Sequence, residues 1–94
     1  MQTLFLDVAS NVGTIALIKD DQILVLRALD HRISDGDLIP LVEDVLKESK
    51  WDYNSLTHLA CVVGPGGFTS LRVGIAFANA LAWDKKIPLA GIHL

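Results

Sequence analysis

Gly64-Pro65-Gly66-Gly67-Phe68-Thr69-Ser70-Leu71-Arg72-Val73-Gly74 is the stretch that decides the fold. The apolar run Leu59-Ala60-Cys61-Val62-Val63 precedes it, and a long apolar helical pattern follows it. This order predicts a strand, a glycine turn and a helix. Glycines allow backbone conformations that other residues avoid, and they bring N–H groups to the start of a helix, where an anion or a polar group is favoured. We therefore expect the turn to be a binding site or the remnant of one.

The sequence around this stretch predicts an α/β domain that occupies residues 1–94. Short links between the first three strands favour an antiparallel meander, and the fourth strand, apolar on both faces, suits the middle of a parallel sheet. The order βββαβαβ is that of one ribonuclease H-like unit, a mixed five-stranded sheet flanked by helices. Strands are expected at 2–8, 14–18, 22–29, 58–63 and 88–92, and helices at Asp35–Lys50 and Thr69–Lys85.

Composition and charge narrow the classes of function. The net charge is −3 and no basic patch is visible, so direct tight binding to RNA or DNA is not expected. The single cysteine, Cys61, lies in a predicted core strand and fits a reducing compartment. No signal peptide and no apolar run of membrane-spanning length is visible. We expect a cytoplasmic protein that does not contact a membrane.

Between its terminal residues Thr69 and Lys85, the second helix carries only four polar residues, Ser70, Arg72, Asn79 and Asp84. A helix that is apolar almost all round must be buried almost all round. One face can pack on the sheet, but a domain of 94 residues has little left to cover the other face. We therefore predict an interface with a second molecule, formed by both helices. The predicted interface residues are Leu38, Leu41, Val42, Val45, Val73, Phe77, Ala80 and Leu81.

Motifs for catalysis or cofactor binding are weak. The glycine turn lacks the Lys-Ser/Thr pair of a nucleotide-binding P-loop, and no set of side chains has metal-ligand spacing. Asp7 ends the first strand and Ser10 follows in the next turn, so the two form a candidate vestigial phosphate site, although Asp7 also suits a turn cap. Thr69 can cap the second helix. Arg72 is either a surface residue or the residue that orders the glycine turn or meets an anion. No catalytic residue, metal or cofactor is expected.

The glycine stretch closely resembles the GPGSFTGLRIG signature of the TsaB (YeaZ) family. Three further segments resemble that family in the same order along the chain. Leu4-Phe5-Leu6-Asp7 is similar to its LALDTS, Leu38-Ile39-Pro40-Leu41-Val42 to its LLPLI, and Ile87-Pro88-Leu89-Ala90-Gly91-Ile92 to its IPLVGV. The resemblance therefore extends over the whole chain.

This resemblance implies an ASKHA-type fold related to actin, and a role in making threonylcarbamoyladenosine on tRNA. It implies a non-catalytic subunit that binds a TsaD-like paralogue and contacts tRNA only indirectly. A TsaE-like ATPase would join this complex, and the same helices would support homodimers. Two departures stand out. Asp7-Val8-Ala9 replaces the family's Asp-Thr-Ser, which weakens the case for a phosphate site, and the family's second domain is absent from these residues.

Three functions follow as hypotheses. The first is an accessory, non-catalytic subunit of a threonylcarbamoyl transferase complex that binds a TsaD-like paralogue, itself, or both. The alternative is a nucleotide-binding, phosphotransferase-like half-domain that is active only as a dimer and binds nucleotide at Asp7 and the glycine turn. The third is an oligomerisation module without a role in tRNA modification. In the first, the glycine turn (Gly64, Pro65, Gly66, Gly67, Phe68, Thr69 and Arg72) fixes the start of the second helix and so the geometry of the interface.

Overall fold

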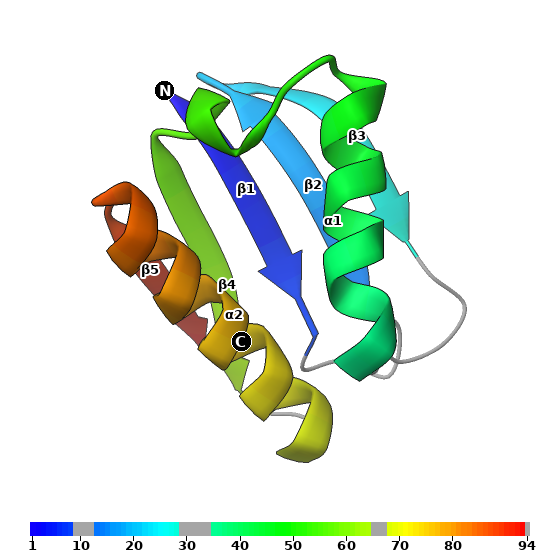
Figure 1. Cartoon of the computed structure of the whole chain (residues 1–94), viewed down its shortest axis with the longest axis vertical. Coiled ribbons are helices and arrows are strands. Elements are labelled where there is room, and N and C mark those ends of the chain that lie inside the picture. Colours follow the sequence, from blue (N-terminus) through cyan, green and yellow to red (C-terminus); the bar gives the residue numbers. More distant parts are fainter. Residues whose placement is uncertain (9–12, 29–34, 65–67, 94) are drawn as a thin grey trace.

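A mixed sheet with two helices over one face forms the fold (Figure 1). The computed structural model describes residues 1–8, 13–28, 35–64 and 68–93. The sheet has five strands in the order β3-β2-β1-β4-β5. In chain order the elements are β1 (Gln2–Asp7), β2 (Thr14–Lys19), β3 (Gln22–Ala28), α1 (Asp35–Glu48), η1 (Tyr53–Ser55), β4 (His58–Gly64), α2 (Phe68–Lys85) and β5 (Leu89–His93).

The strand pairing confirms the predicted topology. β1 pairs antiparallel with β2, and β2 with β3, as a meander. β1 and β4 are parallel, as are β4 and β5. The chain reaches β4 from β3 through α1, and it reaches β5 from β4 through α2. The predicted boundaries were wrong by one or two residues at several ends. α1 ends at Glu48 rather than at Lys50, and α2 begins at Phe68 rather than at Thr69.

The segment between α1 and β4 contains a short helix, η1, which was not predicted from the sequence. Asp52 caps this helix η1, because its Oδ1 accepts a hydrogen bond from the Ser55 N–H over 3.1 Å. The Ser55 hydroxyl accepts in turn from the Asp52 N–H, also over 3.1 Å. This is a capping box, and it fixes the path of the chain from α1 into β4.

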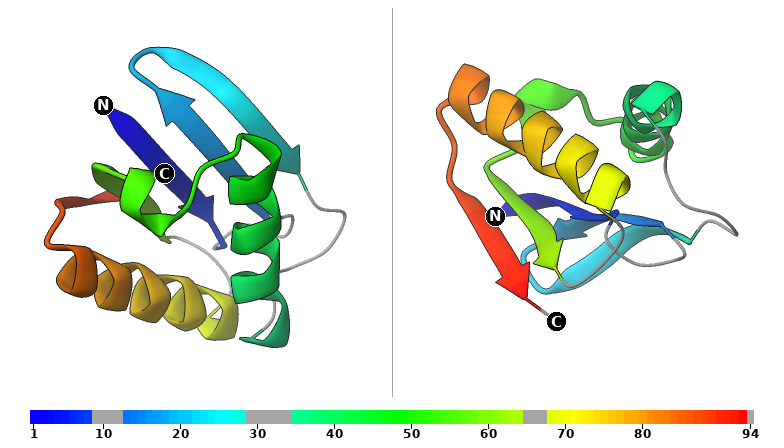
Figure 2. Two further views of the ribbon diagram at one scale, coloured as in Figure 1. Left: turned by 45° about the horizontal axis from the view of Figure 1, so that its top comes forward. Right: turned by 90° about the horizontal axis from the view of Figure 1, so that it is seen from below.

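The hydrophobic core lies between the sheet and the two helices, which both lie on the same side of it (Figure 2). α1 packs over β2 and β3, whereas α2 packs over β4 and β5. Alternate strand residues supply the sheet side of the core, as expected for a two-residue period. The fully buried core residues include Leu4, Leu6, Ile15 and Leu17 from the strands and Leu38, Val42 and Val45 from α1.

Two glycines of the deciding stretch have structural reasons to be glycine. Gly64 ends β4 with a φ of 150°, which other residues rarely adopt. Gly74 lies where α2 meets the end of β1, and a Cβ there would stand 2.1 Å from Cγ2 of Val8. No side chain fits in that space, so Gly74 sets how deeply α2 rests on the sheet. Pro65, Gly66 and Gly67 lie outside the described residues.

An arginine holds α1 against β3, the edge strand beneath it. Nη2 of Arg27 lies 2.6 Å from Oε1 of Glu48, and Nη1 hydrogen-bonds to Oδ2 of Asp44. These two carboxylates, Asp44 before Glu48, raise the pKa of Arg27 above its usual value. Both acids are largely exposed, so the pair contributes modestly to stability but fixes the orientation of the helix.

The other face of the sheet carries no helix within the part of the chain that the structure describes (Figure 2). The strand residues that alternate with the core positions point to this face. They are mostly apolar, among them Phe5, Ala16, Ile18, Leu26 and Val62. The edge residue Leu26 is 62% exposed there.

Candidate interaction surface on the two helices

An apolar groove runs between α1 and α2. Its volume is about 600 Å³, and it is lined by Leu38, Ile39, Arg72, Val73, Ala76, Phe77 and Ala80. Arg72 is the only charged residue among them. The groove exists because the two helices touch each other little while each packs on its own half of the sheet. Apolar side chains that neither helix buries therefore remain open to a partner.

The structure divides the predicted interface residues into two groups. Val73, Phe77 and Ala80 line the groove. Leu38 lines it too, but the side chain is 1% exposed and belongs to the core. Leu41 is half-buried and faces a shallow hollow on the other flank of α1.

For Val42, Val45 and Leu81 the interface prediction was wrong. Val42 and Val45 are 0% exposed and Leu81 is 9% exposed, and all three pack in the chain's own core. Their helical spacing marked the face that each helix turns to the sheet, because that face carries the regular apolar stripe. A partner could reach them only if the helices moved away from the sheet.

Three exposed apolar residues were not among the predicted interface residues. Ile39 on α1 is 51% exposed, Trp83 on α2 is 86% exposed, and Ala76 is exposed. The two on α2 could have been found from the sequence, because the spacing of Ala76, Ala80 and Trp83 puts these three residues on one line along the helix. The opposite line, Gly74, Ala78 and Leu81, is buried against the sheet. α2 thus presents an apolar outer line directly away from the core.

The candidate phosphate site is only partly described. Asp7 ends β1, and Gly64 ends the neighbouring parallel strand β4, so both lie at the same edge of the sheet. Burial raises the pKa of the Cys61 thiol, and the negative charge of Asp7 raises it further. Ser10 lies outside the described residues. In the ranges that the structure describes, no three His, Cys, Asp or Glu side chains gather as a metal site would need.

Thr69 and Arg72 stand at the start of α2. The cap prediction for Thr69 was wrong, because Phe68 already belongs to the helix and Thr69 is its second residue. Arg72 is exposed and lines one end of the groove.

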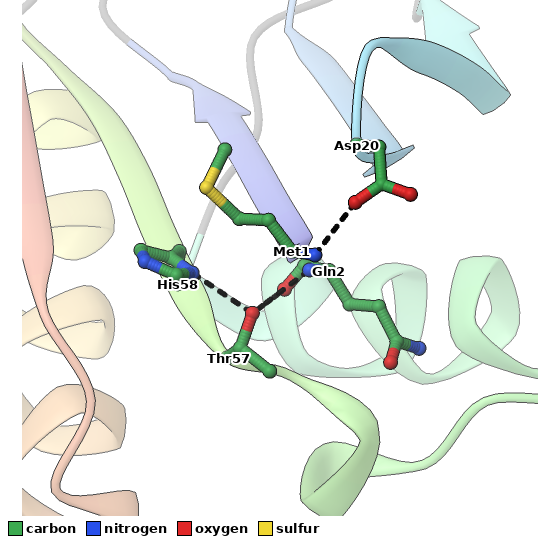
Figure 3. A network of polar contacts seen from close by, with 5 residues as sticks. All are labelled: Met1, Gln2, Asp20, Thr57 and His58. Atoms are coloured by element: carbon green, nitrogen blue, oxygen red, sulfur yellow. Dashed lines mark hydrogen bonds and ion pairs between the residues drawn. The ribbon is translucent and has the colours of Figure 1, made fainter.

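A polar network at the opposite end of the sheet fastens the amino-terminal end of β1 (Figure 3). The Met1 ammonium group donates to Oδ1 of Asp20 over 2.8 Å, and this contact lowers the pKa of Asp20. The Gln2 N–H donates to Oγ1 of Thr57 over 2.8 Å, and the same oxygen lies 2.8 Å from Nδ1 of His58. The network joins β1 to the β2–β3 turn and to the start of β4, so its evident role is structural.

No helix within the described ranges has the length and apolar character needed to cross a membrane.

Known proteins resemble this chain in sequence. The family model described as TsaD, tRNA N6-adenosine threonylcarbamoyltransferase, matches residues 31–94. The tRNA threonylcarbamoyladenosine biosynthesis protein TsaB of Escherichia coli K12 is 32% identical over 92 residues, which are 98% of this chain and 40% of that protein. A tRNA N6-adenosine threonylcarbamoyltransferase of Legionella pneumophila is 43% identical over 56 residues, 60% of this chain and 17% of that protein. The chain thus spans less than half the length of these relatives.

Solved structures confirm the fold class. YeaZ from Pseudomonas aeruginosa superposes with a TM-score of 0.88 at 24% identity, over 98% of this chain and 42% of that one. A Bacteroides thetaiotaomicron protein with an actin-like ATPase fold superposes with a TM-score of 0.56 at 13% identity, over 95% of this chain and 32% of that one. These structures show the fold, and the sequence matches show the family. The chain belongs to the family of TsaD and TsaB, which is involved in tRNA threonylcarbamoyladenosine biosynthesis, and it matches TsaB members over nearly its whole length.

Proposed function

We propose that this chain is a non-catalytic partner subunit in tRNA threonylcarbamoyladenosine modification, and that it binds a TsaD-like paralogue through the groove between α1 and α2. The observation that carries the proposal is the apolar outer surface of these helices, where Ile39 is 51% and Trp83 is 86% exposed. Apolar surface rimmed by polar residues is typical of a protein interaction site.

The shape of the surface supports a helical partner. Ala76 and Ala80 lie on the outer line of α2, and such small side chains let a second helix approach closely. Ile39 and Phe77 form the two walls of the groove, so an apolar side chain placed there would be covered on both sides. Arg72 at one end can meet a carboxylate of the partner and so set the direction in which the partner lies.

A paralogue fits as the partner because it shares this fold. The same residues match TsaD and TsaB sequences, so a TsaD-like protein is expected to carry its own pair of helices at the equivalent place. Two such pairs can pack face to face with pseudo-twofold symmetry. The net charge of −3 speaks against direct tRNA binding, so the proposal assigns the contact with tRNA to the partner. A TsaE-like ATPase would join that complex.

Calorimetric titration with the TsaD-like protein of the same organism tests the proposal. Ala80→Glu puts a charge on the α2 wall of the groove and should weaken binding roughly thirtyfold or more, as for a contact residue that a partner covers. Ala28→Glu is the matched control, because Ala28 is exposed on β3 away from both helices. Circular dichroism shows whether both variants are folded. Wild-type binding that Ala80→Glu leaves unchanged would refute the proposed surface.

A nucleotide-binding half-domain remains the second candidate. The observation in its favour is that Asp7 and Gly64 end neighbouring parallel strands, where ligands of α/β proteins often bind. Titration with ATP and Mg²⁺ separates the two functions. Saturable binding that Asp7→Asn abolishes would support the half-domain, and no saturable heat up to millimolar ATP would leave the partner subunit as the better account.

A further inference from the structure

The outer edge of β3 presents unpaired backbone groups together with exposed apolar side chains. β3 is the last strand on its side of the sheet, so one of its two edges has no partner strand among the described residues (Figure 1). Every second residue of an edge strand turns its N–H and C=O outward, where water or another extended chain can bond them. Three of the six strongly exposed large apolar side chains of the described residues lie on this strand: Ile23 and Leu26 at 62%, and Leu24 at 43%.

A β-bulge places the two most exposed of these side chains on one face of the sheet. Ile23 pairs with Ile18, and Leu26 pairs with Ala16, so β3 takes three steps where β2 takes two. Without the extra residue, Ile23 and Leu26 would point to opposite faces, because side chains alternate along a strand. Both instead point to the face that carries no helix in the described part of the chain, where they form an apolar strip along the edge.

The side of the same edge that faces α1 is acidic. Arg27 points to this side and contacts both Asp44 and Glu48, so two carboxylates share one guanidinium group and a net negative charge remains. The side chains of Asp44 and Glu48 are 67% and 53% exposed. α1 as a whole carries five acidic residues and one basic residue, Lys47. A shallow hollow of about 460 Å³ lies on this flank of α1, lined by Asp37, Pro40, Leu41 and Asp44.

We propose that the outer edge of β3 binds an extended segment of another protein, which adds a strand to the sheet and is apolar on one face and rich in Lys or Arg on the other. Residues 25–28 of β3 pair with β2 residue for residue, so they form the regular stretch that the added strand follows. Its apolar side chains cover Ile23 and Leu26, and its basic side chains lie beside Asp44 and Glu48. The two-residue period of a strand produces these two faces, and added strands are a common mode of peptide recognition. This surface is separate from the groove between α1 and α2, so the inference does not depend on the proposed function.

The charge on α1 favours a basic strand over a second copy of this chain. If two β3 edges paired antiparallel about a twofold axis, both α1 helices would lie on the same side of the joined sheet. Asp44 and Glu48 of each copy would then be turned toward the acidic flank of the other, and like charges that face each other weaken association. Apart from the bulge, β3 has no Lys, Pro or acidic residue of the kind that commonly protects an edge strand. The acidic flank of α1 therefore selects the partner.

The short regular stretch of β3 indicates the strength to expect. An added strand that pairs with residues 25–28 and covers the apolar strip buries less than about 1,200 Å², which is typical of weak and transient complexes. We therefore expect a dissociation constant on the order of 100 μM for a short peptide at low salt. Because the acids on α1 are exposed, salt should screen their attraction and weaken the binding.

NMR titration of the chain with a peptide of about eight residues that alternates Val and Lys tests the inference. The amide signals of β3 should shift and saturate. A peptide that alternates Val and Glu has the same apolar face and should bind at least about tenfold more weakly, because its charges face those of α1. A Val–Lys peptide that is methylated at every backbone nitrogen keeps the side chains but cannot donate to β3, and it should lose binding to a similar extent.

Two matched variants locate the site. Leu26→Lys puts a charge into the apolar strip and should weaken binding of the Val–Lys peptide at least about tenfold. Ile39→Lys is the control, because it adds the same charge in place of an apolar side chain that is 51% exposed on α1, where it lines the groove between the helices. It should leave peptide binding nearly unchanged. Circular dichroism shows whether both variants are folded.

Three results would overturn the inference: no saturable shift with millimolar Val–Lys peptide, equal binding of the Val–Glu peptide, or binding that Leu26→Lys leaves unchanged. Signals of β3 that shift with the concentration of the chain alone, and not with the peptide, would show a second copy at this edge and would also refute it. Ala80→Glu keeps the two proposals apart, because it should weaken binding of the TsaD-like protein and leave peptide binding unchanged. Failure of either titration with wild type leaves the other proposal standing.

Discussion

Gly74→Ala offers the sharpest test of how α2 rests on the sheet. In a helix interior, replacing glycine by alanine usually stabilises by about 1 kcal/mol. Here the new Cβ would stand 2.1 Å from Cγ2 and 3.3 Å from Cβ of Val8. Val8 is 1% exposed, so it has little room to move away. Forcing a methyl group into a packed core costs about 1–3 kcal/mol, and an overlap this close belongs at the upper end. We expect a net loss of about 1–2 kcal/mol.

Urea unfolding followed by circular dichroism measures this change in the free energy of unfolding. Val8→Ala alone should destabilise by about 2 kcal/mol, because it removes two buried methyl groups and leaves a cavity. The double variant Val8→Ala/Gly74→Ala should lose less than the sum of the two single losses, with a coupling of about 1 kcal/mol or more. Gly36→Ala is the control, since Gly36 lies near the start of α1 with no atom close to a Cβ there, and it should be neutral or stabilising.

One result would refute the reasoning. If Gly74→Ala is as stabilising as helix propensity alone predicts, then Val8 and α2 are not in the close contact that the structure gives them. Additive losses in the double variant would point the same way, because residues that share no contact are expected to act independently.

Three further predictions concern single side chains. Oγ1 of Thr3 is buried and has no hydrogen-bond partner among the described residues, so Thr3→Val should stabilise by about 1 kcal/mol in urea unfolding. The pKa of Asp20 is lowered by the Met1 ammonium group, so its contribution to stability is present above the unfolded pKa and lost as the pH falls through the folded one. Asp20→Asn should remove that part of the acid dependence, which a series of denaturation curves below pH 5 would record. Burial raises the pKa of the Cys61 thiol, so the folded protein should react with a thiol reagent at pH 8 far more slowly than the unfolded chain, and stability should fall as the pH rises above the unfolded thiol pKa.

The fold could be predicted from the sequence because each element has a local signal. The strands show alternating or continuous apolar runs, and α1 shows an apolar stripe at helical spacing. The helix η1 was missed although Asp52 and Ser55 stand at the spacing of a capping box, because three residues are too few to give a periodic pattern. Pairings such as Arg27 with Asp44 and Glu48 were not predicted, since they depend on where α1 lies over β3.

The interaction surface was harder to predict, because apolar residues occur both on the side of a helix that faces the sheet and on the side that would face a partner. Regular apolar spacing in α1 identifies the residues that face the sheet, and Val42 and Val45 belong there. Residues that meet a partner are those that stay apolar outside that stripe, as Ile39 does. In α2 the apolar residues surround the helix, so the apolar pattern alone could not tell which line faces outward. Gly74 could have decided it, because a residue without a side chain in a helix indicates close packing on that side.

The glycine stretch and the outer surface of α2 are physically connected. Gly74 lets α2 come down onto Val8, and the outer line of Ala76, Ala80 and Trp83 lies on the opposite side of the same rigid helix. Arg27 holds α1 in place independently of α2. A change in how closely α2 packs on the sheet therefore moves one wall of the groove relative to Ile39 on α1. Gly74, the last residue of the glycine stretch, thus also sets the width of the groove. Its close packing against Val8 explains why this residue is glycine, and no ligand at the turn is needed for that explanation.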